Sequence, residues 1–224
     1  MEILYGLKEL TSFSKSDTCV IFGGSFNPPH IGHTVILSYA LDYFNADFYI
    51  IPTKTPPHKV VDIDFDKRFE WVMKSFKCFD TYKKNQIFLW DLEKHIFGVN
   101  YAIKNVEYFR KYYSNTIILV GEDALGNIEK WYKYEELLNI TTFAIYPRTR
   151  DGSLYKRGQQ ILGNLYSNVI ELRDFPLIEI SSSDIRKRIV EGKSIIGFVD
   201  GEILEDVTNT YLMHHKSHGG NWNE

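Results

Sequence analysis

The chain has 224 residues, and its 26 Lys and Arg residues against 29 Asp and Glu residues give a formal net charge of −3. No basic block stands out, so charge predicts binding neither to nucleic acid nor to a membrane surface. No apolar run approaches the ~20 residues of a membrane-spanning helix. Hydrophobic residues make up 44% of the chain, which is enough for a proper core, and the length allows one large domain or two small ones.

The cysteines indicate the redox environment, and the two chain ends indicate how the domain is delimited. Cys19 and Cys78 form no C-x-x-C motif, which predicts free thiols in a reducing cytoplasm. The first sixteen residues mix charged and apolar side chains, unlike a signal peptide. With no repeat and no long linker, we predict an N-terminal extension over 1–17, one domain over 18–213 and a flexible tail over 214–224.

Strands and helices alternate along that domain. Apolar runs bounded by Pro, Gly or polar residues predict strands, and apolar side chains at helical spacing predict helices. In chain order we expect a strand over 18–23, a helix over 31–44, a strand over 47–52, a loop over 53–59, a helix over 66–79, a strand over 86–91, a helix over 100–113, a strand over 115–121, short helices up to 139, a strand over 141–147, a helix around Gln159, a sixth strand over 168–172, and helices over 181–191 and 201–212. This alternation predicts an α/β fold, a Rossmann-like doubly wound parallel sheet of five to six strands with a C-terminal helical segment.

Ligands of such sheets bind at the carboxyl ends of the strands, near the switch in strand order. Four predicted strand ends carry glycine or polar residues. They are Gly23-Gly24 after the first strand, residues 52–59 after the second, Gly121-Glu122-Asp123 after the fourth and Pro147-Arg148 after the fifth. We predict that these ends form one rim around the site.

The first of these ends opens a longer motif, Ile-Phe-Gly-Gly-Ser-Phe-Asn-Pro-Pro-His-Ile-Gly-His, over residues 21–33. Gly23 and Gly24 let the backbone approach a ligand, and the two prolines stiffen the approach to the helix. His30 and His33 lie three residues apart, which places both imidazoles on one face of the first helical turn. The amides and positive dipole end of that turn favour an anion. The pattern favours phosphate transfer over metal binding; the alternative is a Gly-Pro loop with two surface histidines.

A second motif, Ile-Ser-Ser-Ser-Asp-Ile-Arg, spans residues 180–186. Ser181 and Asp184 have the spacing of a capping box, so one interpretation is simply a capped helix. The other is a second phosphate cradle, in which Arg186 lies one turn into the helix and its guanidinium holds two phosphate oxygens. Two helix N-termini that face one another would suit the two ends of a triphosphate.

These motifs carry a family resemblance. Residues 23–33 resemble the signature of the nucleotidyltransferase superfamily, the (H/T)-x-G-H group. With Pro-Pro-His-Lys at 56–59 and the motif at 180–186, the chain is most similar to bacterial nicotinate-mononucleotide adenylyltransferases. Two further family features are matched, a G-x-D segment followed by a Trp and a Pro-Arg after the fifth strand. They fall on Gly121, Asp123 and Trp131, and on Pro147-Arg148.

The resemblance covers residues 18–212 and implies a reaction in which ATP and a pyridine mononucleotide give the dinucleotide and pyrophosphate. The mononucleotide phosphate attacks the α-phosphorus of ATP in line. A phosphate oxygen is already anionic at pH 7, so no protein nucleophile is needed and catalysis consists of positioning and charge stabilisation. The resemblance implies Mg²⁺ carried by ATP oxygens and water, with no protein metal ligand.

The resemblance also assigns roles to residues on the ATP side. His33 serves the α-phosphate in the transition state and His30 the phosphate chain. Ser181, Ser182 and Arg186 hold the leaving pyrophosphate. Asp123 lies at the ribose and Arg148 on the adenine side. The other ATP-binding residues expected are Gly23, Gly24, Ser25, Phe26, Gly121, Ile180, Ser181 and Ser182.

On the acceptor side, the resemblance places Trp131 against the pyridine ring, with Thr53 and Lys59 near the mononucleotide. We expect Trp71 and Trp90 to be core residues instead. A family pattern G-x-S-Y-T, whose Thr lies near the pyridine substituent, aligns with residues 98–102. Ala102 replaces that Thr and cannot form the hydrogen bond, so the choice between nicotinate and nicotinamide mononucleotide stays open.

Two further residues depart from the family pattern, and two other functions stay open. Asn27 and Ser183 replace the Asp and Thr that are commoner in the family. Expected partners are ATP and a pyridine mononucleotide, without nucleic acid or membrane, and homo-oligomerisation stays open. A pantetheine-phosphate adenylyltransferase or a cytidylyltransferase is an alternative that residues 56–59 and Trp131 argue against. A non-catalytic nucleotide sensor is another, although such a protein need not keep His30, His33 and Arg186.

Overall fold

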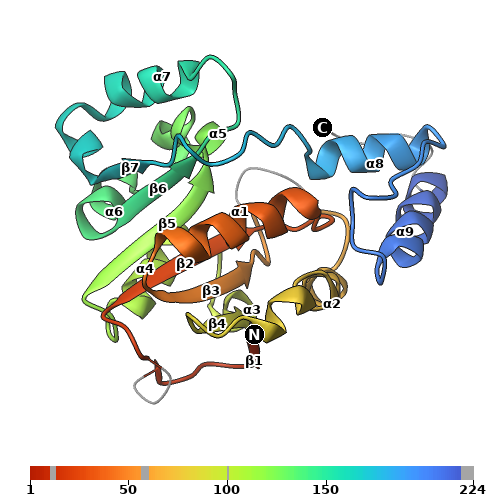
Figure 1. The fold of residues 1–224 in the computed structure, drawn as a ribbon, viewed down its shortest axis with the longest axis horizontal. Helices are drawn as coiled ribbons and strands as arrows, with labels where there is room; N and C mark the ends of the chain where they lie inside the picture. Colours follow the sequence, from red (N-terminus) through yellow and green to blue (C-terminus); the bar gives the residue numbers. More distant parts are fainter. Residues whose placement is uncertain (11–13, 57–60, 100, 218–224) are drawn as a thin grey trace.

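The computed structural model describes residues 1–10, 14–56, 61–99 and 101–217. Figure 1 shows a layered α/β fold with a helical segment at one end. The elements, in chain order, are β1 Glu2–Leu4, β2 Thr18–Gly24, α1 Ile31–Tyr43, β3 Asp47–Pro52, α2 Phe65–Ser75, β4 Ile87–Trp90, α3 Leu92–His95, α4 Ala102–Phe109, β5 Asn115–Gly121, α5 Glu122–Leu125, α6 Tyr134–Ile140, β6 Thr142–Tyr146, α7 Ser153–Leu162, β7 Val169–Glu171, α8 Ser182–Val190 and α9 Leu204–Ser217. Short 3₁₀ turns lie at Lys77–Thr81, Ile128–Lys130 and Gly163–Asn168.

The strands of the described residues form one seven-stranded sheet in the order β1-β4-β3-β2-β5-β6-β7, with every pair parallel. The strand order reverses at β2, which pairs with β3 on one side and β5 on the other. This is the switch point at which ligands of doubly wound sheets bind. The α/β prediction is therefore confirmed, and the predicted rim of strand ends lies along one edge of the sheet.

The predicted number of five to six strands is wrong by one, because β1 adds an edge strand. Glu2, Ile3 and Leu4 pair in parallel with residues 88–90 of β4. Of these three residues only Leu4 is buried, and so short a segment shows no alternation that would mark it as a strand. The stretch expected as an N-terminal extension thus begins within the sheet.

Alternation along the strands divides the core between the two faces. In β2, Val20 and Phe22 contribute to the core beneath α1 and α2, whereas Cys19 and Ile21 contribute to the core beneath α4, α6 and α7. Successive side chains of a strand point to opposite faces, so each face needs its own helical cover. Trp71 and Trp90 are fully buried, as predicted.

The C-terminal segment has a third core, in which α8 and α9 pack on α2 through Trp71, Ile185 and Tyr211. The two helices lie beyond the carboxyl ends of the strands (Figure 1). Helix α9 continues to Ser217, beyond the predicted helix end at residue 212 and into the stretch expected as a tail. His214, His215 and Lys216 occupy the last turn, where positive charge complements the helix dipole. Residues 218–224 lie outside the described residues.

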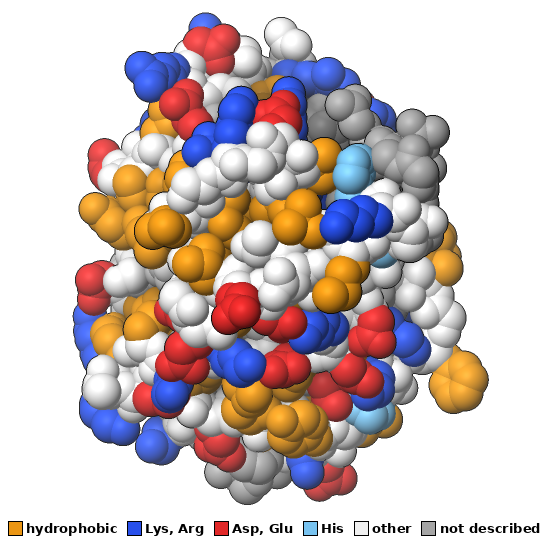
Figure 2. Space-filling model, turned by 90° about the vertical axis from the view of Figure 1, so that its right-hand side faces the viewer, with side chains coloured by type: hydrophobic (Ala, Val, Ile, Leu, Met, Phe, Trp, Pro, Cys, Tyr) orange, Lys and Arg blue, Asp and Glu red, His pale blue; other side chains and the backbone are white. Residues whose placement is uncertain are grey.

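Acidic and basic side chains are interspersed on the face that Figure 2 shows, the side on which the C-terminal segment lies. Within the described residues, every helix is too short or too polar to cross a bilayer.

Candidate active site

The loop between β2 and α1 places the paired histidines at the switch point. Gly23 is exposed and Gly24 and Ser25 are half-buried, so their backbone lies where a ligand can approach it. Phe26, predicted to contact ATP, turns its side chain into the core instead. The residue is 1% exposed, and its ring packs edge-on against the His33 ring at a centroid distance of 4.9 Å. Phe26 therefore supports His33 through ring packing, and its side chain is not open to a ligand.

The three-residue spacing brings the two imidazoles together. Their ring centroids lie 3.7 Å apart, and the backbone N–H of His30 donates to Nδ1 of His33 at 3.1 Å. Because Nδ1 accepts this bond, a neutral His33 carries its proton on Nε2, where it can donate to a phosphate oxygen. Position 32, which lies between the two histidines in the sequence, requires glycine, because a Cβ there would lie 2.9 Å from Nδ1 of His30.

His30 is 5% exposed, and burial lowers its pKa to about 4, with a further contribution from the positive charge of Arg148 and an opposing one from Asp184. The unfolded chain, whose histidine pKa is ~6.5, binds a proton first as the pH falls. His30 therefore lowers the stability of the folded protein progressively between pH 6.5 and pH 4, by roughly 3 kcal/mol in full.

A His30→Gln variant should not show this proton-linked loss of folding stability at low pH. Urea denaturation at pH 7.5 and pH 4.5 is expected to show that wild type loses roughly 2.5 kcal/mol more than the variant between the two pH values. An identical pH dependence in the two proteins would contradict the assigned pKa of His30.

The start of α8 is a capping box. Oγ of Ser181 accepts from the Asp184 N–H at 3.1 Å, and the Asp184 carboxylate accepts from the Ser181 N–H at 3.2 Å. The hydroxyls of Ser181 and Ser182 donate to protein oxygens, those of Asp184 and Pro28. Because the capping box uses the N–H groups of Ser181 and Asp184, what this turn offers a phosphate is the N–H groups of Ser182 and Ser183, which have no acceptor within the helix. The structural interpretation of the second motif is confirmed, and it leaves the phosphate-binding one available.

The two motifs are in direct contact, although more than 150 residues separate them. The Ser182 hydroxyl donates to the Pro28 carbonyl at 2.8 Å, and Nη1 of Arg186 donates to the Asn27 carbonyl at 2.8 Å. A second Arg186 nitrogen, Nη2, donates to Oγ of Ser183 at 3.1 Å. The helix starts of α1 and α8 therefore lie side by side, as two ends of one triphosphate require.

Helix α9 and the loop before it form hydrogen bonds that support the first motif. Sequence reasoning missed these contacts. The buried Tyr211 hydroxyl donates to Oδ1 of Asn27 at 2.6 Å, and the Ile31 N–H donates to the Phe198 carbonyl at 2.8 Å. An amide oxygen accepts the Tyr211 bond as a carboxylate oxygen would, which explains why Asn can replace Asp at position 27.

A Tyr211→Phe variant leaves the buried Asn27 oxygen without this donor. We expect a loss of 1–3 kcal/mol in stability, the usual range for an unsatisfied buried polar group, together with a roughly tenfold rise in the KM for ATP as the loop loosens. Denaturant titration and initial rates measure the two effects. Tyr166→Phe is the matched control, because it removes a hydroxyl bonded to Glu171 away from this loop; a similar rise in its KM for ATP would refute the role of Tyr211.

The ends of β5 and β6 form the predicted nucleoside side. A Cβ at Gly121 would lie 2.4 Å from Oδ1 of Asp123 and 3.0 Å from Cγ of Arg148, so a larger residue there would displace the Asp123 carboxylate from its present position. The Asp123 side chain is 72% exposed and lies 3.9 Å from Nε of Arg148. Buried Glu122 accepts the backbone N–H groups of Arg148 and Thr149 at 3.1 and 3.0 Å. Glu122, which sequence reasoning did not single out, therefore fixes the loop that carries Arg148.

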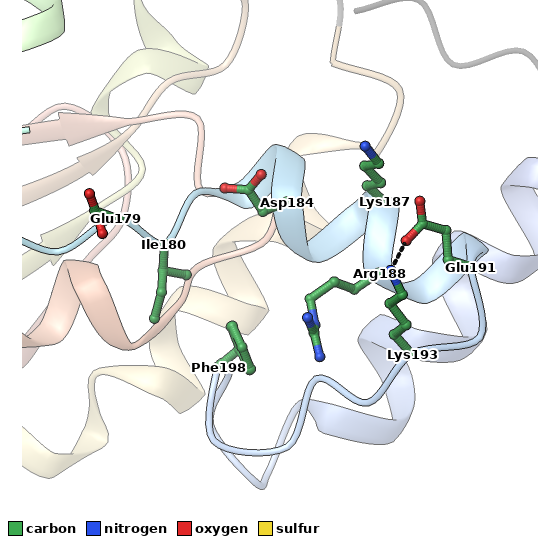
Figure 3. A pocket seen from close by; sticks show the side chains of 8 residues that line it. All are labelled: Glu179, Ile180, Asp184, Lys187, Arg188, Glu191, Lys193 and Phe198. Carbon is green, nitrogen blue, oxygen red and sulfur yellow. Dashed lines mark ion pairs between the residues drawn. The ribbon is translucent and has the colours of Figure 1, made fainter.

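Arg148 also connects this side to the second motif, because its Nη1 donates to the carbonyls of Ile178 and Ile180 at 3.2 and 3.4 Å. Ile180 faces a cavity of about 340 Å³ along α8, shown in Figure 3. Two basic groups of this cavity are occupied by protein partners: Lys193 pairs with Glu191, and Arg188 donates to the Ser194 carbonyl. The cavity belongs to the C-terminal segment and adjoins the predicted site through Ile180, Asp184 and Phe198.

The predicted acceptor residues lie on neighbouring elements. The Thr53 N–H donates to the Gly24 carbonyl at 2.8 Å, which joins the end of β3 to the first motif. Tyr101, before the first residue of α4, Ala102, stacks on Tyr132 at a centroid distance of 4.3 Å. Trp131 precedes Tyr132 and packs edge-on against core Phe143, so its stacking on a pyridine ring stays a prediction. Lys59 lies outside the described residues.

Known proteins resemble this chain in sequence and in fold. A family model described as "Cytidylyltransferase-like" matches residues 21–188. Two relatives are named "Probable nicotinate-nucleotide adenylyltransferase". That of Thermosipho melanesiensis is 43% identical over 199 residues, 88% of this chain and 98% of the relative, and that of Thermotoga maritima is 38% identical over 205 residues, 91% and 97%.

Among solved structures, Plasmodium falciparum nicotinic acid mononucleotide adenylyltransferase complexed with NaAD superposes with a TM-score of 0.61. The alignment covers 91% of this chain and 98% of that one at 19% identity, and it confirms the Rossmann-like fold. The family resemblance of the sequence motifs is likewise confirmed by the relatives. The chain therefore belongs to the nicotinate-nucleotide adenylyltransferase family, within the cytidylyltransferase-like nucleotidyltransferases.

Proposed function

We propose that this protein transfers AMP from ATP to nicotinate mononucleotide and releases pyrophosphate, giving deamido-NAD in NAD biosynthesis. The observation that carries the proposal is the contact between the two helix starts, where Ser182 and Arg186 donate to the carbonyls of Pro28 and Asn27. This contact creates one anion-binding region with two helix dipoles and the His30–His33 pair beside it. The names of the relatives support nicotinate mononucleotide as the acceptor.

In the proposed reaction, a phosphate oxygen of the mononucleotide forms a bond to the α-phosphorus of ATP. The bond from that phosphorus to its bridging oxygen breaks, and the electron pair leaves with pyrophosphate. Nε2–H of His33 donates to the α-phosphate oxygen as charge develops there, and the α8 start with Arg186 stabilises the pyrophosphate. Mg²⁺ would be carried by ATP oxygens and water and would neutralise part of the phosphate charge.

Asp123 and Arg148 hold the adenosine in this proposal. Asp123 is exposed in α5, just after the end of β5, and carries two acceptor oxygens for the ribose hydroxyls. Gly121 leaves room for the Asp123 and Arg148 side chains to lie against its backbone. Neither Cys19 nor Cys78 is paired with another thiol, in keeping with the reducing cytoplasm that we propose as the site of the reaction.

Purified protein with ATP, Mg²⁺ and each pyridine mononucleotide in turn tests the proposal. We expect equimolar dinucleotide and pyrophosphate, with a higher kcat/KM for nicotinate than for nicotinamide mononucleotide. Pyrophosphate release only with phosphopantetheine, or only from CTP, would assign the chain to another reaction of the superfamily. Tight nucleotide binding without turnover would identify a sensor.

A further inference from the structure

The two residues that follow β3 have no regular structure, yet their backbone groups are bonded to protein. The Thr53 N–H donates to the Gly24 carbonyl at 2.8 Å, and the Lys54 N–H donates to Oε2 of Glu93 at 3.0 Å. The carbonyls of Thr53 and Lys54 accept from Nη1 and Nη2 of Arg68 at 2.8 and 3.2 Å. The backbone N–H and C=O groups of an exposed loop ordinarily form hydrogen bonds to water. Here they bond to protein groups, so this segment is held unusually firmly.

Arg68 is the centre of this arrangement. Its side chain projects from α2 and is 1% exposed, and burial lowers its pKa. Besides the two loop carbonyls, the guanidinium donates to the Ile63 carbonyl through Nε at 2.9 Å and to the Ser25 carbonyl through Nη1 at 2.6 Å. One side chain therefore connects the loop of the first motif to the loop that follows β3.

Glu93 holds the same segment from the opposite direction. It lies in α3, is 4% exposed, and accepts from Nδ2 of Asn105 at 2.8 Å as well as from Lys54. Asn105 lies one turn into α4, the helix that begins at Ala102. Burial raises the pKa of Glu93 to about 7, against the hydrogen bonds from Asn105 and Lys54 and the charge of Arg68. The carboxylate thus ties residues 53–54 to the helix predicted to face the pyridine substituent.

Fold stability alone does not call for these two charged groups. Burying an ion costs several kcal/mol, and apolar replacements of buried ionic groups are often neutral or stabilising. Arg68 and Glu93 instead hold the backbone of the two predicted substrate loops. One loop is predicted to contact ATP at Ser25, and the other is predicted to contact the mononucleotide at Thr53. An in-line attack depends on the relative placement of two substrates to within fractions of an ångström.

We propose that Arg68 and Glu93 are positioning residues, which fix the Thr53–Lys54 backbone relative to the Ser25 loop and to α4 and so set where the acceptor nucleotide lies. The proposal rests on the proposed function. Glu93 acts on the acceptor side alone, whereas Arg68 acts on both substrate loops. The two residues should therefore give different kinetic signatures.

The test compares Glu93→Gln, Glu93→Ala and Arg68→Lys with wild type under saturating and limiting amounts of each substrate. We expect the Glu93 variants to raise the KM for nicotinate mononucleotide about tenfold with the KM for ATP unchanged. Arg68→Lys, which replaces a forked donor with a point charge, should raise both KM values and lower kcat about tenfold. Glu129→Gln, which removes an ion pair with Arg157 outside this region, is the matched control and should leave both KM values unchanged.

Amide hydrogen exchange at Lys54 gives a second measurement that needs no substrate. Exchange should be at least tenfold faster in Glu93→Gln than in wild type or the Glu129→Gln control, in protein whose thermal midpoint confirms folding. Equal rises of both KM values in the Glu93 variants, or unchanged Lys54 exchange, would overturn the positioning role. Failure of wild type to use either mononucleotide would instead overturn the proposed function, whatever the exchange data show.

Discussion

Replacing His33 with alanine is expected to lower kcat by ~10²-fold or more, the usual effect of removing a donor to charge that develops in a transition state. The KM for ATP should change little, because the interaction strengthens only as the α-phosphorus is attacked. The geometry prepares the group for this role: its Nδ1 accepts from the His30 N–H at 3.1 Å, which leaves the proton on Nε2, and the Phe26 ring supports it.

Single-turnover and steady-state rates measure this effect. His95→Ala is the matched control, since that imidazole pairs with Asp91 at 2.9 Å beside β4, away from the first motif. The control should retain kcat within about threefold. A folded His33→Ala protein that turned over as fast as the His95 control would remove His33 from the mechanism.

Arg186→Lys should lower kcat/KM for ATP by ~10²-fold, because the substitution removes charge-assisted hydrogen bonds each worth ~1.5–3 kcal/mol. The guanidinium joins α8 to the first motif through the Asn27 carbonyl and also bonds Ser183. In the proposed complex its fork additionally holds the leaving pyrophosphate. A lysine keeps the charge but cannot reproduce the planar fork, so charge alone should not rescue activity.

The same helix supplies the control for this variant. Arg188 also lies in α8, but its guanidinium covers the Phe198 ring at 4.7 Å and donates to the Ser194 carbonyl. Arg188→Lys is expected to keep kcat/KM within about threefold. If the two arginine variants behave alike, the loss reflects helix stability, and Arg186 has no special role at the phosphates.

The first motif and the strand alternation could be predicted because both are local signals. Gly23, Gly24 and the His30–His33 spacing determine backbone approach and ring placement within one turn, and the structure brings the rings within 3.7 Å. The capping box at Ser181 is equally local, and its hydrogen bonds are present. The doubly wound topology follows from the alternation of elements.

The supports of the site could not be predicted in this way, because they are long-range contacts. Tyr211 and Asn27 are separated by 184 residues, and no periodicity relates them. A charged residue such as Arg68 is expected on the solvent-exposed face of a helix. The surrounding loops bury it instead, and their backbone carbonyls accept hydrogen bonds from its guanidinium. Short edge strand β1 shows the same limit, since its pairing with β4 depends on the rest of the sheet.

A crystal structure with a non-hydrolysable ATP analogue and Mg²⁺ would show whether the two helix starts bind one triphosphate. The triphosphate should lie between the two helix starts, with the α-phosphate within hydrogen-bonding distance of His33 Nε2 and the terminal phosphates at the first turn of α8 and Arg186. A triphosphate bound at one helix start only, or in the cavity lined by Lys187, Arg188 and Lys193, would show that the two helix starts do not form one phosphate site.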